Sequence, residues 1–326
     1  MSDSLFIKLT EQQIDTVNKQ ISQQIDSPVE YLNQVCFHLI DAGGKRIRPR
    51  LMLLCAGLVN GKQIQHEELD EKIYSLAASV EILHTATLMH DDVIDEGLMR
   101  RGRLSVNNAF GNRVAVLGGD YLFTKAYNTS IKINNPQISR LFSNTLATLV
   151  EGELTQMSNI ANTGISEETY FKTIYSKTSA LFEITSKIPG FIYNCTDEQI
   201  ERLALYGRNI GYVFQIADDI LDYTADSKTL GKIAGKDMEE FKITLPVIYT
   251  IKNNCGISGE DVYKAVNSKD IVTLKEMINR TGAISRCDDV ANRLIAEAVH
   301  ALDAFPDSEY RDALEELANA AYRRRN

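Results

Sequence analysis

The sequence lacks the features that mark several common classes of protein. It has no tryptophan and only six prolines among 326 residues, and no proline-rich or glycine/serine-rich stretch suggests a linker. The longest apolar run, residues 51–59, is too short to cross a bilayer. The first ten residues include acidic and polar side chains, so we expect no signal peptide. We therefore expect a single domain, residues 1–326, in the cytoplasm and without a transmembrane segment.

Cysteines are few, and their spacing suits neither a disulfide framework nor a zinc site. The chain has five of them, an odd number, and no Cys-x-x-Cys pair. A reducing compartment is the simplest setting for such a set. The five are Cys36, Cys55, Cys195, Cys255 and Cys287.

A surplus of positive charge is missing as well. The net charge is −9, so the overall field does not attract nucleic acid, and we expect no nucleic-acid partner. Basic residues still cluster locally, as they commonly do on solvated faces or at helix ends. The clusters are Lys45, Arg46, Arg48 and Arg50, and then Arg100, Arg101 and Arg103.

Strand signals are almost absent, whereas helix signals recur along the chain. Ser27-Pro28 and Asn135-Pro136 are typical of an N-cap followed by a first helical residue. Thr196–Gln199 fits a capping box, and Asp41–Gly44 is typical of a helix end. The pattern predicts an all-α fold, a large helical bundle with ten or more helices.

Two Asp-Asp-x-x-Asp motifs, residues 91–95 and 218–222, stand at the ends of predicted helices. Residues i and i+4 share a helix face, so the outer aspartates of each motif point the same way. Hard carboxylate oxygens of this kind suit Mg²⁺, which binds through a few carboxylates and substrate phosphates. One motif alone would also fit an exposed acidic stripe, but two in the same context favour metal. The candidate ligands are Asp91, Asp92, Asp95, Asp218, Asp219 and Asp222.

The residues before each motif on the same helix face are small, apolar or polar but uncharged. His84 and Thr87 precede Asp91 at steps of three and four, and Gln215 precedes Asp218 by three. A face that becomes acidic towards its end fits a cavity with an apolar base and a charged mouth. His84 is either a ligand at this mouth or a hydrogen-bonded core histidine.

Basic residues near the motifs are candidates for binding phosphate. Lys45 and Arg48, three residues apart beside Gly43-Gly44, could grip one diphosphate at a helix start. A metal-bound diphosphate also needs cations beside its remaining oxygens, so other basic residues near the motifs are candidates as well. The further candidates are Arg100, Arg101, Lys177-Thr178, Lys232 and Lys242.

These motifs together resemble those of the trans-type (all-E) polyprenyl diphosphate synthases. The resemblance is close from about Tyr31 to about Pro246 and looser to the end, and it looks closest to the bacterial octaprenyl diphosphate synthases. The motifs that carry it are Gly43–Pro49, His84–Asp95, Met99–Gly102, Gly119–Tyr121, Glu151–Glu153, Lys177-Thr178, Gly211–Asp222, Leu230–Lys232 and Lys242–Pro246.

The resemblance implies a homodimer of all-α subunits with the isoprenoid synthase fold, each around a deep central cavity that binds two to three Mg²⁺ ions. It implies that isopentenyl diphosphate is held by Lys45, Arg48, His84 and Arg101. It implies that the allylic diphosphate is held by Arg100, Lys177, Thr178, Gln215, Lys232 and Lys242, directly or through metal. The residues expected to act in catalysis are Asp91, Asp95, Lys177, Asp218 and Lys232.

Product length is expected to depend on a tunnel beneath the first motif. Ala86 and Thr87, five and four residues before Asp91, are small, so the tunnel should be open. Phe123 and Tyr127 are candidates for its floor. Each added carbon buries apolar surface worth roughly 0.8 kcal/mol, so an open tunnel favours further growth of the chain. We expect a product of about eight isoprene units. Such a product would supply a quinone side chain such as that of ubiquinone, and its release would involve transient contact with a membrane.

Four alternatives remain open. The chain could make a shorter product, geranylgeranyl or farnesyl diphosphate, or could be a non-catalytic subunit of a heteromeric synthase. A terpene cyclase also uses an acidic magnesium motif, but it has no use for a second diphosphate site such as that of Lys45, Arg48 and Arg101. A helical scaffold without activity is the fourth.

Overall fold

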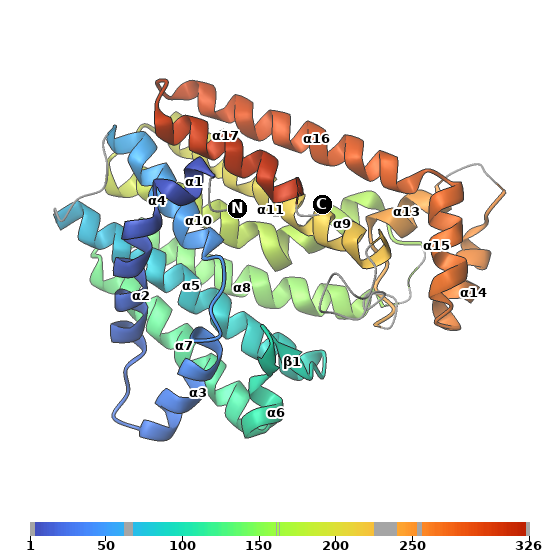
Figure 1. Ribbon diagram of the computed structural model, residues 1–326, viewed down its shortest axis with the longest axis horizontal. Helices are drawn as coiled ribbons and strands as arrows, with labels where there is room; N and C mark the ends of the chain where they lie inside the picture. The colour runs from blue at the N-terminus through green and yellow to red at the C-terminus, as the bar shows by residue number, and fades with distance from the viewer. Residues whose placement is uncertain are drawn as a thin grey trace. The chain divides into compact units, whose positions relative to one another are not determined.

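The structure is a computed structural model that describes residues 4–61, 68–160, 162, 164–224, 240–252 and 256–323 (Figure 1). It confirms the all-α class: the described residues are mostly helical, with one two-stranded hairpin. The first half contains α1 (Leu5–Lys8), α2 (Glu11–Ile25), α3 (Glu30–Ile40), α4 (Ile47–Asn60), α5 (Glu68–Ile94), β1 (Met99–Arg100), β2 (Arg103–Leu104), α6 (Val106–Phe110) and α7 (Asn112–Lys132). The second contains α8 (Pro136–Ser158), α9 (Glu167–Ile174), the π-helix η1 (Tyr175–Ser179), α10 (Ala180–Ile192), α11 (Asp197–Thr224), α13 (Leu245–Ile251), α14 (Gly259–Asn267), α15 (Ile271–Arg280), α16 (Ala283–Ala301), the 3₁₀ turn η2 (Leu302–Ala304) and α17 (Glu309–Tyr322).

The chain forms two compact units. Unit 1 comprises Met1–Asn144, Ile184–Ala204 and Ala304–Glu316. Unit 2 comprises Thr145–Glu183, Leu205–Asp303 and Leu317–Asn326. The helices α8, α10, α11 and α17 contribute residues to both units. A single domain over 1–326 stays a prediction.

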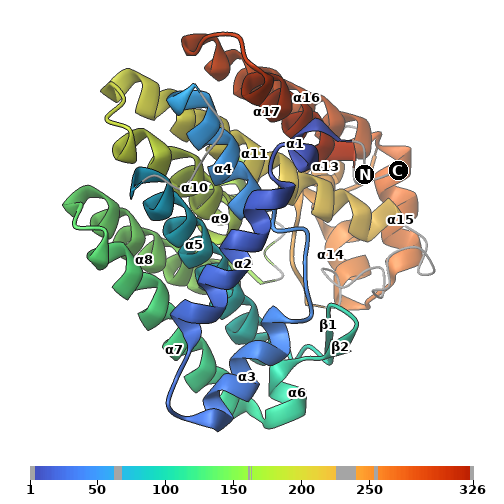
Figure 2. The ribbon, with the colours of Figure 1, turned by 60° about the vertical axis from the view of Figure 1, so that its left-hand side comes forward.

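In unit 1, α5 is the central helix. It packs against α2, α4 and α7, and Figure 2 shows α2 running across α5 and α7. The facing helix α4 is apolar nearly all round, with residues 51–56 completely or almost completely buried. Small residues bring α7 close to α5, because a Cβ on Gly119 would overlap the His90 ring. Close packing of this kind fixes the orientation of the C-terminal end of α5, where the first aspartate motif lies.

In unit 2, α11 buries one apolar stripe at helical spacing, made of Tyr206, Ile210, Val213, Ala217 and Ile220. The outer aspartates of the second motif lie off this stripe. The helices α13, α14, α15 and α16 pack together, and the Arg286 guanidinium lies 4.2 Å from the centre of the Tyr249 ring.

Three of the predicted helix boundaries are confirmed. Asn135 Oδ1 accepts the N–H of Gln137 (3.0 Å) at the start of α8. At the start of α11, the Thr196 N–H donates to Gln199 Oε1 (3.1 Å) and the Gln199 N–H donates to Thr196 Oγ1 (3.3 Å), which is a capping box. The helix α3 ends at Ile40, directly before the predicted stop.

The predicted helix start at Ser27-Pro28 is wrong, because α3 begins at Glu30. Ser27 Oγ accepts the N–H of Val29 (3.1 Å), and Asn33 Oδ1 accepts the N–H of Ser27 (3.0 Å). These bonds close a loop before the first helical turn. The helix therefore begins two residues later than predicted, at Glu30 and not at Pro28, and Ser27 stabilises the preceding loop.

The hairpin of β1 and β2 was not expected from the sequence. Its two-residue turn, Arg101-Gly102, has both residues in the left-handed region, with φ of 51° and 77°. Such turns match the twist of antiparallel strands. The strands are two residues long, too short to show an alternating pattern, so the Gly at the turn was the only signal.

Two further expectations concern cysteines and membranes. Of the five cysteines, Cys36, Cys55, Cys195 and Cys287 are free thiols, and Cys255 lies outside the described residues. Among the described helices, none combines the length and the hydropathy needed to span a membrane.

Candidate active site

The basic segment at the start of α4 divides into inward and outward residues. Arg46 is buried: its guanidinium pairs with Glu81 (2.9 Å) and also donates to Asn18 and to the Ile40 carbonyl. Arg50 is buried too and donates to Thr10 Oγ1 (2.7 Å) and to the Glu11 carboxylate (2.8 Å). These two arginines anchor the segment. Lys45 is exposed and Arg48 is half-buried; their role in binding a diphosphate stays a prediction.

His84 lies in unit 1 among several arginines. Burial lowers the pKa of its imidazole well below the usual value, and the positive charges of Arg48, Arg101, Arg100 and Arg46 lower it further. The ring retains some solvent exposure, so it is not a sealed core residue. Arg46 and Arg100 are paired with Glu81 and Asp92, so Arg48 and Arg101 are the members of this group that would attract an anion.

Arg101 comes from the turn of the hairpin and reaches the glycine loop before α4. Its Nη1 donates to the Gly43 carbonyl, and its guanidinium lies where a side chain on Gly44 would be, with Cζ 3.1 Å from an added Cβ. Burial lowers its pKa, Glu81 raises it, and Arg46 and Arg100 lower it again, yet an arginine stays charged at neutral pH. Gly44 thus makes room for the Arg101 guanidinium.

The first aspartate motif stands at the end of α5. The helix ends at Ile94, and the N–H of Asp95 still donates to the Asp91 carbonyl (2.8 Å), so Asp95 continues the turn. Asp91 and Asp95 are half-buried, whereas Asp92 is completely buried. Asp92 Oδ1 accepts two bonds from Arg100, 2.9 Å from Nε and 2.5 Å from Nη2.

In unit 2, Lys177 and Thr178 lie in the π-helix η1, which interrupts the path from α9 to α10. A π-turn closes i→i+5 bonds and is frequently found at functional sites. Lys177 Nζ donates to Gln156 Oε1 (2.8 Å) and pairs with Glu153 (3.0 Å). Thr178 Oγ1 donates to Gln215 Oε1 (2.7 Å).

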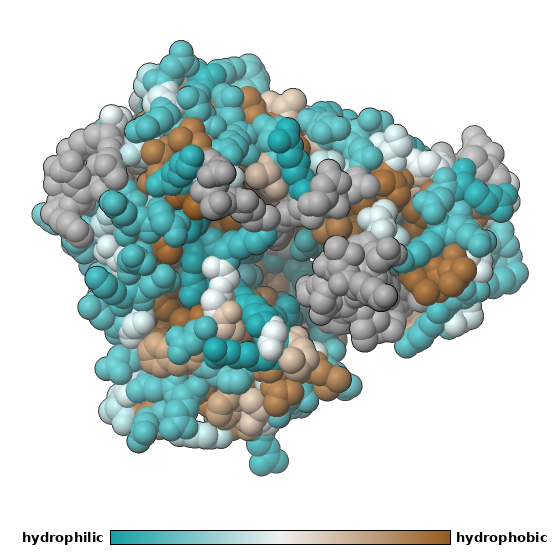
Figure 3. Space-filling view, in the orientation of Figure 1, coloured by the Kyte–Doolittle hydropathy of each residue, from teal (hydrophilic) through white to brown (hydrophobic). Residues whose placement is uncertain are grey.

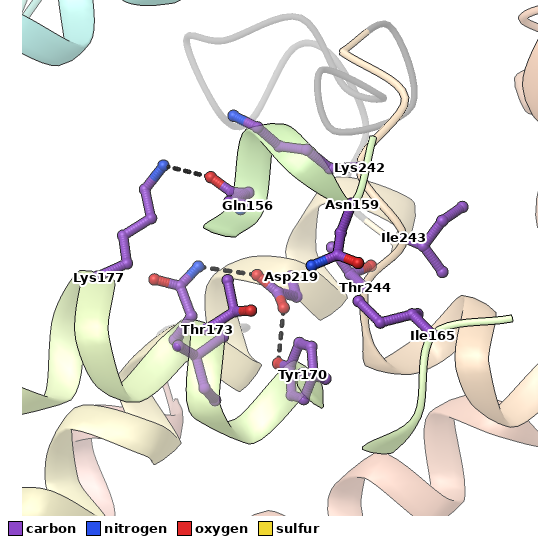
Figure 4. Close-up of a pocket in the computed structure, with 12 residues that line it drawn as sticks. Gln156, Asn159, Ile165, Tyr170, Thr173, Lys177, Asp219, Lys242, Ile243 and Thr244 are labelled. Atoms are coloured by element: carbon purple, nitrogen blue, oxygen red, sulfur yellow. Dashed lines mark hydrogen bonds between the residues drawn. The ribbon is translucent and has the colours of Figure 1, made fainter. Parts of the chain in front are cut away.

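The second aspartate motif stands within α11. Asp218 is exposed and Asp222 is half-buried, whereas Asp219 is only 3% exposed. Asp219 accepts bonds from Gln215 Nε2 (2.8 Å) and Tyr170 OH (2.7 Å), drawn in Figure 4. Burial raises the pKa of the Asp219 carboxyl; the two hydrogen bonds oppose this shift, and the charges of Asp218 and Asp222 add to it.

These residues line a pocket within unit 2 with about 660 Å³ of empty space, part of it open to solvent. Figure 4 shows the predicted residues Lys177, Asp219 and Lys242 around it, and Gln215 also lines it. The sequence did not identify the other polar lining residues, which are Gln156, Asn159, Tyr170, Thr173 and Thr244. Gln156 had a signal, because it lies one helical turn after Glu153 on the same face of α8. Thr244 also had one, because it belongs to the motif Lys242–Pro246. Asn159, Tyr170 and Thr173 had none, since isolated polar residues are common everywhere.

The two lysines predicted in the later half of the sequence are Lys242 and Lys232. Lys242 lines the pocket and pairs with Glu240. Lys232 lies outside the described residues.

The residues expected to control product length all lie in unit 1. Ala86 is completely buried, and Thr87 is half-buried and donates to the His84 carbonyl (2.8 Å). Phe123 and Tyr127 are half-buried on α7, and the Phe123 ring packs edge-on against His90, with centroids 5.2 Å apart. That contact places Phe123 beside α5; its role as a tunnel floor stays a prediction.

The donors suit Mg²⁺ better than a softer metal. In the part of the chain that the structure describes, no three His, Cys, Asp or Glu side chains form a group that could hold a metal ion by themselves. The half-buried and exposed aspartates offer hard oxygens in pairs, which matches an ion that takes one or two carboxylates and completes its shell with water and phosphate. The residues present therefore fit a magnesium–diphosphate complex.

Comparison with known proteins identifies the group to which this chain belongs. The family model for polyprenyl synthetase matches residues 29–280, which include both aspartate motifs and both basic sets. The chain belongs to the polyprenyl synthetase family. Polyprenyl synthetases are prenyltransferases, and this chain is therefore an enzyme of that class.

Relatives of this polyprenyl synthetase match it over nearly the whole length. The octaprenyl diphosphate synthase of Escherichia coli is 36% identical over 321 residues, which covers 97% of each chain. A polyprenyl synthase from Caulobacter crescentus, solved in complex with calcium and isoprenyl diphosphate, has a TM-score of 0.90 at 34% identity and covers 99% of this chain and 98% of its own. A decaprenyl diphosphate synthase from Rhodobacter capsulatus has a TM-score of 0.89 at 32% identity, with 98% of each chain covered. The predicted family and its fold are confirmed.

Proposed function

We propose that this polyprenyl synthetase is a long-chain all-trans polyprenyl diphosphate synthase that adds isopentenyl diphosphate to an allylic diphosphate such as farnesyl diphosphate. We propose octaprenyl diphosphate as its product, destined for the side chain of a quinone such as ubiquinone. The relative named octaprenyl diphosphate synthase, 36% identical over 97% of the chain, supports this choice. The enzyme would work in the cytoplasm.

One observation carries the proposal. Each unit contains its own set of cationic or polar groups beside an aspartate motif. In unit 1, four arginines surround the neutral His84 near Asp91–Asp95. In unit 2, Lys177, Gln215 and Lys242 line one pocket with Asp219 of the second motif. Two such sets fit a reaction with two diphosphate substrates, which a terpene cyclase would not need.

The roles of the residues follow from the charge changes in the reaction. The carbon–oxygen bond of the allylic diphosphate breaks, and negative charge grows on the leaving diphosphate. Lys177 and Lys242 would bind this group and stabilise the charge, with Lys232 as a third candidate. Magnesium would be held by the outer aspartates, Asp91 and Asp95 in unit 1 and Asp218 and Asp222 in unit 2, and would supply Lewis-acid chemistry to diphosphate.

The second substrate would be held in unit 1. Lys45, Arg48 and Arg101 would bind isopentenyl diphosphate, and neutral His84 would donate one hydrogen bond. The double bond of isopentenyl diphosphate attacks the allylic carbon, and a new carbon–carbon bond forms. The proton that is lost goes to an oxygen of the released diphosphate. Arg100 and Thr178 would orient the allylic diphosphate during this exchange.

Product analysis tests this function. The full-length enzyme, expressed alone and given Mg²⁺, labelled isopentenyl diphosphate and farnesyl diphosphate, should yield mainly C40 chains on reversed-phase chromatography. The small side chains of Ala86 and Thr87 support a long product, so Ala86→Phe should shorten it to mainly C20 chains. Mainly C20 products from the unaltered enzyme would instead support the shorter-chain alternative. No turnover without a second polypeptide would support the non-catalytic subunit.

We also propose a homodimer. The unit 2 part of α8 carries an exposed apolar stripe at helical spacing, made of Val150 (57% exposed), Leu154 (60%) and Met157 (48%). Three large apolar side chains on one exposed helix face are typical of a protein–protein contact.

Transient contact with a membrane would let a C40 product leave. Apolar side chains are exposed around the hairpin of unit 1, where Figure 3 shows brown patches in the region of β1 and α6. They include Leu98 (68% exposed), Met99 (58%) and Leu104 (52%).

A further inference from the structure

We propose that Glu183 is a positioning residue that acts with Tyr175 and Arg208. Together they hold the π-helix η1 in the form that directs Lys177 towards the pocket of unit 2. The described residues that line this pocket include none of the three, and all three belong to unit 2. The inference rests on the proposed function, because Lys177 is there assigned to the allylic diphosphate.

The π-helix η1 depends on contacts with other helices, because a π-turn is much rarer than an α-turn and contains one residue more. A return to α-helical geometry would rotate the segment by about 100° relative to α10. Lys177 is the third of the five residues of η1. This rotation would turn its ammonium away from its present partners, Gln156 and Glu153 of α8.

The carboxylate of Glu183 on α10 joins the start of η1 to α11. Glu183 Oε2 accepts a hydrogen bond from Arg208 Nε of α11 (2.7 Å) and forms an ion pair with it. The same carboxylate accepts a hydrogen bond from the hydroxyl of Tyr175, the first residue of η1. Glu183 is therefore the common acceptor for one donor in η1 and one donor in α11.

The protonation states of these groups suit a permanent contact. The Glu183 side chain is only 12% exposed. The pKa of Tyr175 is raised to about 12, by burial first and then by the charge of Glu183 and the hydrogen bond to it. The phenol therefore stays protonated at neutral pH and remains a donor. The hydrogen bond to Glu183 also raises the pKa of Arg208, so the arginine stays charged.

The other end of η1 is attached to the same part of α11. Ser179, the last residue of η1, donates its hydroxyl to the backbone carbonyl of Arg208. The Tyr175 ring lies 6.4 Å, between centroids, from the ring of Tyr212, one turn after Arg208. Both ends of η1 thus contact residues 208–212, and Arg208 takes part through its side chain at one end and through its carbonyl at the other.

Steady-state kinetics of the full-length enzyme with Mg²⁺ test the role, because the effect should be confined to one substrate. Tyr175→Phe removes a single hydroxyl, and the KM for farnesyl diphosphate should rise by about fivefold or more. The KM for isopentenyl diphosphate should change by less than about twofold. Glu183→Gln should give the same separation with a rise of about tenfold or more. Equal changes in the two KM values, or no change in either, would overturn the positioning role.

The matched control uses a second ion pair between α10 and α11. Lys187 Nζ lies 2.6 Å from Glu201 Oε1, and both residues belong to unit 1. The Glu201 side chain is 64% exposed, and exposed ion pairs contribute little. Glu201→Gln should therefore leave both KM values within about twofold of the original. A rise for farnesyl diphosphate as large as that of Glu183→Gln would indicate a general disturbance of α10 and would overturn the specific role of Glu183.

A double-mutant cycle tests whether Tyr175 acts through Lys177. In the Lys177→Ala background, Tyr175→Phe should change kcat/KM for farnesyl diphosphate by less than about twofold, because the group that it positions is absent. Losses that multiply would overturn this route. Circular dichroism checks the fold of each variant. If Glu183→Gln does not fold, Tyr175→Phe decides the outcome, since it keeps the ring and removes only the hydroxyl.

The Lys177→Ala variant also separates this inference from the proposed function. If Lys177→Ala keeps the full kcat/KM for farnesyl diphosphate, the role of Lys177 in the proposed function fails, and the inference fails with it. If Lys177→Ala loses activity while Tyr175→Phe and Glu183→Gln behave as the original enzyme, the inference alone fails. A loss in all three variants, confined to the allylic substrate, is the expected result.

Discussion

His84 shows how a single residue responds to the charges gathered around it. Burial and the arginines near it hold the pKa of its imidazole well below the usual value. The folded state therefore binds fewer protons here than the unfolded state at pH below about 6.5, the ordinary pKa of histidine. The free energy of unfolding should fall as pH drops through this range, by up to about 1.4 kcal/mol per pH unit for one site.

The matching experiment compares urea unfolding at pH 7.5 and 5.5 for the original protein and for His84→Asn. The variant should lose less stability on acidification, because the histidine that cannot protonate in the fold is gone. His300→Asn is the matched control, since the His300 side chain is 76% exposed and pairs with the nearby Asp303. An unchanged acid dependence in His84→Asn would contradict the assignment.

Single residues also show what the sequence could and could not predict. The spacing of Lys45 and Arg48, three apart beside a helix start, predicts a shared ligand, and both are less buried than Arg46 and Arg50. The inward role of Arg46 was not predictable, because its partner Glu81 is 35 residues away. Spacing identifies residues that share a face, whereas the partner across the fold depends on tertiary packing.

At the scale of elements, the π-helix η1 is held between two close helix contacts. On Gly152 of α8, a Cβ would overlap Ser176, and on Gly211 of α11, a Cβ would lie 2.5 Å from the Ser179 Cα. Gly152 and Gly211 both belong to motifs found in the sequence, but their spacing did not show why glycine is needed at these two positions. They allow two helices to approach the backbone of η1, which carries Lys177 and Thr178.

Gly211→Ala should therefore push η1 away and disturb the residues that it carries. We expect a loss of stability of about 1–3 kcal/mol, typical of overpacking, and a fall in kcat of tenfold or more. Thermal unfolding and steady-state kinetics with the allylic substrate measure the two effects. Gly259→Ala on α14 is the control, because its added Cβ would meet its nearest neighbour, Ile251, at 3.7 Å. A Gly211→Ala enzyme with normal kcat would contradict the close contact.

Helices were easier to predict than the elements between them. Caps such as Asn135 and Thr196 act locally, so the sequence around them contains the whole signal. The hairpin and the π-helix depend on contacts with other segments. The π-helix η1 is contacted by α8 and α11, and no pattern within residues 175–179 themselves predicts these contacts.

At the scale of the whole molecule, the exposed stripe on α8 bears on assembly. If Val150, Leu154 and Met157 meet a second copy of the chain, Leu154→Glu places a charge in the contact. A cost of about 2 kcal/mol corresponds to roughly 30-fold weaker association. Sedimentation velocity at low micromolar concentration should then show a shift from dimer towards monomer.

The control for this experiment is Val272→Glu on α15, since Val272 is 64% exposed and lies on a different helix. It should leave the sedimentation coefficient unchanged. A Leu154→Glu protein that sediments as the original does would assign the stripe to something other than self-association.

The π-turn between α9 and α10 also changes the angle about the helix axis at which the buried side chains lie. A π-turn holds one residue more than an α-turn, and one residue corresponds to about 100° of rotation about the axis. The apolar stripe of α10 is therefore out of phase with that of α9, although the backbone runs on without a break. A single amphipathic period therefore does not describe residues 167–192, because the phase changes at the π-turn that carries Lys177.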